Sequence, residues 1–204
     1  LSELIYLNLS VNHLSGGIPS ELGQLTSLRI LDLHENNITG SIPHQLEKLN
    51  LLNELSLYSN NLTGSIPVSI GNFRNLFILD LSWNKLSGSI PEELGKLTSL
   101  RSLWLDENIL TGSIPACIGN LGNLTLLALC ENKLSGSICN EIGMLSSLAF
   151  LYLHKNNLSG SIPTSIVNLG NLSDLFLNDN KLSGPIPQEI GKLGSLLKLL
   201  LFSN

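Results

Sequence analysis

An asparagine recurs every 24 residues along the whole chain, with no insertion or deletion. The nine members of this asparagine ladder are Asn12, Asn36, Asn60, Asn84, Asn108, Asn132, Asn156, Asn180 and Asn204. A leucine frame surrounds each one, and in the first copy it consists of Leu4, Leu7, Leu9 and Leu14. A fixed period of about 20–50 residues predicts a repeat solenoid, in which each unit buries its apolar face only against its neighbours. At this period, the 204 residues (1–204) give one solenoid of 8.5 repeats.

Each repeat also contains a short stretch in which apolar and polar residues alternate. In the first copy Leu7 and Leu9 point to one side and Asn8 to the other, which is the period of a β-strand. One such strand per repeat predicts a concave parallel sheet of about nine strands. The ladder asparagine falls where the chain leaves this sheet. Its amide can donate to and accept from backbone groups of adjacent turns, so we assign the ladder a structural role.

The second half of each repeat reads Leu-Ser/Thr-Gly-Ser-Ile-Pro, as in residues 62–67 and 86–91. Glycine lets successive turns approach closely, and proline ends the extended stretch because it has no N–H. This L-x-G-x-I-P motif resembles the plant-specific leucine-rich repeats of receptor kinases, receptor-like proteins and polygalacturonase-inhibiting proteins, along the whole chain. The resemblance implies an α/β-type repeat solenoid, a superhelical arc with few helices and a short second sheet. Three frame positions depart from the motif: Glu47 and Val167 replace glycine, and Cys139 replaces proline.

The resemblance also implies a function. It points to the extracellular ligand-recognition segment of a plant receptor-like kinase or receptor-like protein, anchored in the plasma membrane through its parent chain. The partners would be a peptide or protein on the concave face and a co-receptor. Any kinase activity would lie in a cytoplasmic domain outside this chain, so we expect no enzyme here.

Two alternatives remain open at this stage. One is a secreted inhibitor of a cell-wall enzyme, which would use the same concave face. The other is a structural role with end-to-end self-association, because both ends fall within a repeat and neither carries the polar cap that solenoids need. A fragment of a larger ectodomain would explain the missing caps equally well.

Composition excludes several other classes. The net charge is −5, without a basic cluster, so the sequence predicts no nucleic-acid partner. No apolar run approaches the roughly 18 residues of a membrane span, so we expect no membrane contact by this segment. Every glycine belongs to the repeat frame, which leaves no phosphate-binding loop and predicts no cofactor.

The positions that vary from repeat to repeat lie on the exposed face of the concave sheet, four and two residues before each ladder asparagine. Aromatic side chains exposed there are favoured anchors at interfaces. Trp104, Ala128 and Tyr152 predict a slot, with two rings about 10 Å apart over an alanine floor. The alternative is that neighbouring rings stack on one another and stabilise the sheet. The predicted ligand-binding residues are Asp32, His34, Tyr58, Asp80, Trp83, Trp104, Asp106, Ala128, Tyr152, His154 and Phe176.

Asp106, Cys130 and His154 occupy one position in three successive repeats and suggest a nucleophilic triad or a metal site. A triad needs the imidazole between the nucleophile and the acid, whereas here the cysteine stands in the middle. An open sheet also offers no oxyanion hole. We therefore predict neither catalytic nor metal-ligating residues.

Cysteines and glycosylation motifs indicate the compartment. Cys117 and Cys139 lie in adjacent repeats two positions out of register, which places a disulfide between them at the limit of the allowed Cα separation. The N-x-S/T motif arises easily from the repeat consensus, but the resemblance implies glycosylation in the secretory pathway. The candidate sites are Asn37, Asn61, Asn123, Asn157, Asn171 and Asn8, the last on the exposed face of a strand, where a glycan would obstruct a ligand.

Overall fold

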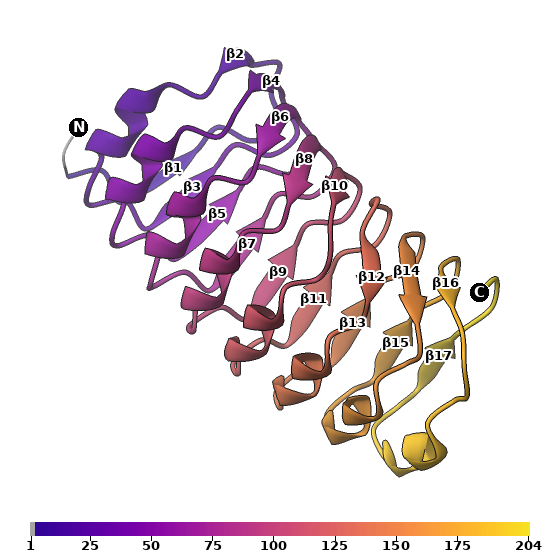
Figure 1. Cartoon of the computed structure of the whole chain (residues 1–204). Coiled ribbons are helices and arrows are strands. Elements are labelled where there is room, and N and C mark those ends of the chain that lie inside the picture. Colours follow the sequence, from indigo (N-terminus) through magenta and orange to yellow (C-terminus); the bar gives the residue numbers. More distant parts are fainter. Residues whose placement is uncertain (1–2) are drawn as a thin grey trace.

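A computed structural model describes residues 3–204, and its repeats stack side by side in sequence order (Figure 1). Each repeat contributes one three-residue strand to a nine-stranded parallel sheet in the order β1-β3-β5-β7-β9-β11-β13-β15-β17. These strands are β1 (Tyr6–Asn8), β3 (Ile30–Asp32), β5 (Glu54–Ser56), β7 (Ile78–Asp80), β9 (Ser102–Trp104), β11 (Leu126–Ala128), β13 (Phe150–Tyr152), β15 (Asp174–Phe176) and β17 (Lys198–Leu200). The predicted concave sheet is confirmed.

A second set of short parallel strands follows the L-x-G-x-I-P motif. It forms a five-stranded sheet, β2 (Ser15–Gly17), β4 (Asn37–Gly40), β6 (Asn61–Ser65), β8 (Lys85–Ser89) and β10 (Ile109–Thr111), and a three-stranded sheet, β12 (Ser135–Ser137), β14 (Asn157–Gly160) and β16 (Lys181–Leu182). The second sheet is therefore present, as expected, but interrupted between β10 and β12. Backbone bonds still cross this interruption, since the Ser135 N–H donates to the Gly112 carbonyl at 2.8 Å.

Within residues 3–204, eight 3-10 helices carry the chain back to the concave sheet, and each follows the proline position of the frame. They are η1 (Ser20–Gln24), η2 (His44–Lys48), η3 (Val68–Asn72), η4 (Glu92–Lys96), η5 (Ala116–Asn120), η6 (Asn140–Met144), η7 (Thr164–Asn168) and η8 (Gln188–Lys192). Cys139, which replaces proline before η6, has φ −68° and ψ 148°, close to the values of the prolines. The substitution therefore keeps the local conformation.

The frame glycine of these helices sets how closely neighbouring repeats pack. A Cβ on Gly95 or Gly119 would lie 2.6 or 2.7 Å from a backbone oxygen of the next helix, which no side chain tolerates. Glu47 in η2 and Val167 in η7 carry a side chain at this position. Each of these two helices packs less closely on the next one, η3 or η8, than the other neighbouring helices pack on one another. These two departures from the motif therefore loosen the stack locally.

The core is a continuous column of leucine and isoleucine that runs along the solenoid axis. Leu79, Leu81 and Leu86 are fully buried, as are their counterparts in the neighbouring repeats, and Phe73 adds one buried aromatic ring. The strands pair in a register of 24 residues, for example Leu79 with Leu103, so equivalent side chains stack on one another. No helix among residues 3–204 has the length and apolar character that crossing a membrane requires.

From Asn36 onward, each ladder asparagine bonds to the backbone of two repeats. Asn108 Nδ2 donates to the carbonyls of Leu105 and Asp106 in its own repeat, at 3.2 and 3.1 Å. It also donates to the Leu81 carbonyl of the preceding repeat at 3.0 Å, and its Oδ1 accepts the Leu86 N–H at 2.9 Å. The ladder thus satisfies backbone groups that would otherwise be buried without partners, and its structural role is supported by these contacts.

The residue before each ladder asparagine forms a left-handed corner. The nine corner residues have φ between 49° and 57°, and none is glycine. The sequence frame did not reveal this conformation, which costs about 1–3 kcal/mol for residues other than glycine. The corner persists because its backbone continues the sheet, as the Trp83 N–H donates to the Asp106 carbonyl at 3.0 Å and the Asn84 N–H to the Glu107 carbonyl at 3.1 Å.

Replacing Asn108 with alanine should leave the buried Leu86 N–H without a partner, and an unsatisfied buried group costs about 1–3 kcal/mol. The Leu81, Leu105 and Asp106 carbonyls each lose one of their two donors, because Asn84, Asn132 and the Trp83 N–H still donate to them. We expect N108A to lose about 1–3 kcal/mol in chemical unfolding. The matched control is N12A, because Asn12 is exposed and its amide donates only to the Leu9 and Ser10 carbonyls within its own repeat. Equal losses in the two variants would contradict the inter-repeat role of the ladder.

Candidate functional site

Each repeat places three positions on the concave face: the first and third residues of its strand and the second residue after the strand, whereas the middle residue of the strand points into the core. Besides the positions four and two residues before the ladder asparagine, the first residue of each strand also lies on this face. The sequence analysis did not include this row. The same two-residue alternation, continued to the position six residues before each ladder asparagine, would have predicted it. Its members are Tyr6, Ile30, Glu54, Ile78, Ser102, Leu126, Phe150, Asp174 and Lys198.

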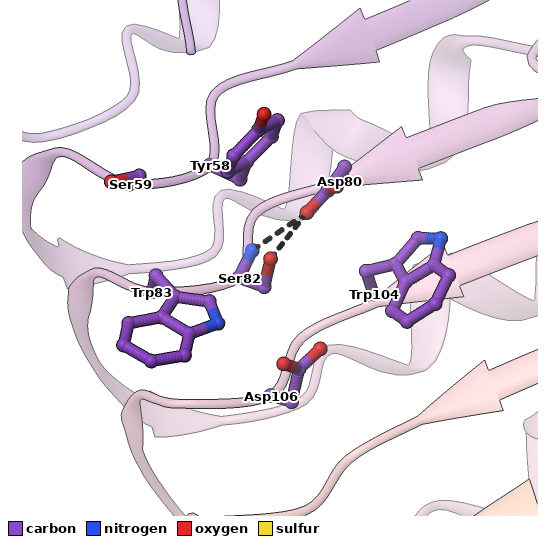
Figure 2. A pocket seen from close by; sticks show the side chains of 7 residues that line it. All are labelled: Tyr58, Ser59, Asp80, Ser82, Trp83, Trp104 and Asp106. Atoms are coloured by element: carbon purple, nitrogen blue, oxygen red, sulfur yellow. Dashed lines mark hydrogen bonds between the residues drawn. The ribbon is translucent and has the colours of Figure 1, made fainter. Parts of the chain in front are cut away.

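A pocket of about 380 Å³ lies on the concave face, in the third to fifth repeats. We call it the tryptophan pocket. It is lined by three aromatic residues, two carboxylates and two serines: Tyr58, Trp83, Trp104, Asp80, Asp106, Ser59 and Ser82. Figure 2 shows the two indole rings on opposite sides, with Ser82 and Asp106 between them. Five of these residues belong to the predicted ligand-binding set, whereas Ser59 and Ser82 were not predicted to contact ligand.

Trp83 reaches this pocket because it occupies a left-handed corner, with φ 52°. Its side chain is 58% exposed, an unusual state for a large apolar ring in a soluble protein. Trp104 comes from the end of strand β9 instead, so the two indoles approach the pocket from different parts of adjacent repeats. The positions of Trp83 and Trp104 within the repeat do not by themselves predict that the two rings line one pocket.

The two carboxylates of the pocket differ in their hydrogen bonding. Asp80 Oδ1 accepts from the backbone N–H and the hydroxyl of Ser82, at 3.0 and 2.6 Å. Burial raises the pKa of Asp80, and these two bonds counteract the rise. Asp106 is 9% exposed, and its Oδ1 has no hydrogen-bond partner among the described residues. Burial raises the pKa of Asp106 to about 7, and the neighbouring charges of Asp80, Glu107 and Glu131 add to the rise.

The acids of the first repeats are already paired. Asp32 Oδ1 lies 2.6 Å from His34 Nδ1, and the His34 ring stacks on Tyr58 with ring centres 4.4 Å apart. The Tyr58 hydroxyl donates to Glu35 at 3.1 Å. Asp32 and His34 therefore support one wall of the tryptophan pocket through Tyr58 and do not line it.

The C-terminal half of the face carries a separate aromatic cluster. Tyr152 packs on Phe176 with ring centres 5.0 Å apart, and both rings contact His154 at 6.5 and 5.9 Å. Trp104, Ala128 and Tyr152 are neighbours in register, as predicted. However, Ala128 is only 1% exposed, so the proposed slot over an alanine floor is wrong and the alternative of ring stacking holds for Tyr152. The tryptophan pocket lies on the N-terminal side of Trp104, away from Tyr152.

The row Asp106, Cys130 and His154 does not form a catalytic unit. Among the described residues no hydrogen bond joins the three side chains, and His154 Nδ1 has no partner. Burial raises the pKa of Cys130 to about 12, with a contribution from the Asp106 charge, so the thiolate is disfavoured. Burial also lowers the pKa of His154. Within residues 3–204 no group of three or more His, Cys, Asp or Glu side chains is arranged to hold a metal ion.

All three cysteines are free thiols in the structure, so a disulfide between Cys117 and Cys139 is not formed. Cys117 lies within η5, whereas Cys139 precedes η6, so the two residues do not occupy equivalent positions of their repeats. None of the six candidate glycosylation asparagines is buried. Asn37, Asn61 and Asn157 begin strands of the second sheet, on a side of each repeat that is separate from the concave face.

Comparison with known proteins identifies the repeat. Family models match as "Leucine-rich repeat region" over residues 1–113 and as "Leucine Rich Repeat" over residues 147–169 and 171–193. The chain therefore belongs to the leucine-rich repeat family, as its motif indicated. No curated protein matches it significantly.

Solved structures of plant receptors share the fold. The plant peptide hormone receptor RGFR1 in complex with RGF2 is 41% identical, with a TM-score of 0.93 over 94% of this chain and 31% of that chain. A TDR receptor is 35% identical, with a TM-score of 0.91 over 100% of this chain and 40% of that one. The PEPR1–AtPEP1 structure is 36% identical, with a TM-score of 0.76 over 100% of this chain and 35% of that one. This chain thus spans well under half the length of each.

The raised pKa of Asp106 predicts a specific pH dependence of stability. Because the folded state holds the pKa at about 7, above the ordinary 3.8, ionisation opposes folding, and stability falls as pH rises between these values. Asparagine cannot ionise, so D106N should melt about 2–4 °C above the wild type at pH 8, with the difference vanishing near pH 4. The control is E92Q, which removes an exposed carboxylate of η4 outside the pocket. A D106N melting temperature that differs from the wild type equally at both pH values would contradict this assignment.

Proposed function

We propose that this chain is the ligand-recognition segment of a plant cell-surface receptor and that it holds a peptide along its concave face. The observation that carries the proposal is the tryptophan pocket, which gathers two indoles and two carboxylates on the open face of the sheet. Exposed aromatic side chains beside unpaired polar groups are features of binding sites and are unfavourable on a surface that binds nothing.

The solved relatives support a peptide as the ligand. RGFR1 is a plant peptide hormone receptor, in complex with RGF2, and its structure superimposes on nearly the whole of this chain. Three concave positions in every repeat also suit an extended peptide, which would cross the repeats and meet the side chains of one repeat after another. Within this proposal any catalytic activity belongs to other parts of the parent protein.

A secreted inhibitor of a cell-wall enzyme would use the same face, so the partner's size distinguishes the two functions. The tryptophan pocket favours a peptide, because a volume of about 380 Å³ accepts single side chains. The parent gene beyond Asn204 offers an independent criterion. A receptor requires a membrane span there, whereas an inhibitor ends after the repeats.

Selection from a random linear peptide library displayed on phage tests the proposal. Peptides enriched on the wild type should bind the W83A/W104A double variant, which removes both indoles of the pocket, at least about 30-fold more weakly, the loss expected from a hot-spot residue of ~2 kcal/mol. Binding should be unchanged in M144A, which shortens a 60% exposed side chain of η6. Near-identical melting temperatures would show that the double variant is folded. Peptides that bind the double variant as well as the wild type, or a library that yields none, would sink the proposal.

An extracellular location predicts glycans on the native protein. Asn37, Asn61 and Asn157 are the preferred acceptors, because they avoid the concave face. Asn8 is disfavoured, since its amide already donates to Asp32 at 3.0 Å on that face. Endoglycosidase treatment of the protein isolated from its own tissue should lower its mass, and peptide mapping should locate the glycans at these three sites. A native protein of unmodified mass would contradict the secretory location.

A further inference from the structure

The tryptophan pocket carries negative charge without a positive partner. Its lining includes Asp80 and Asp106 but no lysine, arginine or histidine. Elsewhere on the same face, carboxylates have cations of their own: Asp174 contacts Lys198 Nζ at 3.2 Å, and Glu131 is paired with Lys155. The two pocket carboxylates therefore lack the counter-ion that Asp174 and Glu131 have, although burial makes a counter-ion more valuable there.

Asp106 shows most clearly that a partner is missing. It is 9% exposed, so its carboxylate is largely removed from water, and Oδ1 accepts no hydrogen bond from any described residue. A buried charged oxygen without a donor costs free energy, and native proteins normally satisfy such groups. The carboxylate points toward Ser82 and the space between the two indoles, where a bound group would meet it (Figure 2).

The walls of the pocket attract the same kind of ligand. Indole rings carry negative charge on their faces and bind cations better than other side chains do. Trp83, Trp104 and Tyr58 supply three such rings around the carboxylates. A guanidinium suits this arrangement better than an ammonium, because its plane stacks on aromatic rings while its N–H fork donates to a carboxylate.

We propose that the tryptophan pocket binds the guanidinium of an arginine side chain of the peptide ligand, between the indoles of Trp83 and Trp104 and against the Asp106 carboxylate. The inference rests on the proposed peptide-binding function and adds the chemistry of one anchor residue. Asp106 is the ion-pairing group, the indoles provide stacking, and Asp80 contributes a second negative charge while it remains bonded to Ser82.

Binding should depend on pH, because the cation pairs with the ionised carboxylate. Burial opposes the ionisation of Asp106 most, and the charges of Asp80, Glu107 and Glu131 oppose it further. The Cys130 thiol of the next repeat also faces this carboxylate, whose charge helps to raise the pKa of the thiol. A bound guanidinium favours the ionised form, so affinity should rise from pH 6 to pH 8 and level off above that. Residues 3–204 offer no cation in the pocket lining that would compete.

Intrinsic fluorescence gives a direct readout, because the two tryptophans of the chain, Trp83 and Trp104, both line the pocket. The probe is acetyl-Gly-Arg-Gly-amide, and the comparison peptides carry citrulline, the neutral isostere of arginine, or lysine. We expect saturable quenching by the arginine peptide, with a Kd on the order of 1 mM for so small a ligand. Citrulline should bind at least about 10-fold more weakly, and lysine should be intermediate.

Variants separate the ion pair from general charge. D106N should weaken arginine binding about 10-fold or more and abolish its pH dependence, the loss expected when a charge-assisted bond is removed. E92Q, which changes the net charge equally outside the pocket, should leave binding unchanged.

Several results would overturn the inference. Equal binding of the arginine and citrulline peptides, absence of saturable quenching, or wild-type binding by D106N would each do so. Equal binding of lysine would overturn the guanidinium preference. If library-selected peptides still depend on Trp83 and Trp104 while the arginine peptide fails, the inferred anchor is wrong and the proposed peptide-binding function stands.

Discussion

The hydrogen bonds of the asparagine ladder are the constraint on which the rest of the structure depends. From Asn36 onward, each ladder amide binds backbone groups of its own repeat and of the one before it, so it closes a corner and joins two repeats with one side chain. The corner is left-handed at nine non-glycine residues, a conformation that the chain adopts because these bonds and the continued sheet compensate for it. The length of each strand and the spacing of the exposed rows follow from this corner.

Most of the architecture could be predicted because the sequence has two regular periods, one of 24 residues and one of two residues. The 24-residue ladder gives the solenoid, and the alternation of leucines gives the nine-stranded sheet with its register. The left-handed corners could not be predicted in this way, since residues as different as Val11, Glu35 and Trp83 occupy them and no glycine marks them. The interruption between β10 and β12 also has no sequence signal, because the motif continues through it.

The candidate site was predicted only as a set of exposed positions. Periodicity assigned Trp104, Asp106 and Tyr152 to the concave face, and the structure places them there. It could not decide which rings pack together, because that depends on side-chain volumes and rotamers across neighbouring strands. Tyr152 therefore packs on Phe176 rather than facing Trp104, and the hollow opens beside Trp83. The unpartnered Asp106 oxygen also became evident only once its surroundings were known.

The corners separate the tasks of folding and recognition. The bonds that hold a corner are made by its backbone, as with the Trp83 N–H and the Asp106 carbonyl, while the corner side chain takes no part in them. Exchanging that side chain changes the chemistry at the rim of the sheet without removing a single bond of the frame. A solenoid of this kind can therefore acquire a new ligand preference through point substitutions at its corners, and the stability of the repeats limits that change very little.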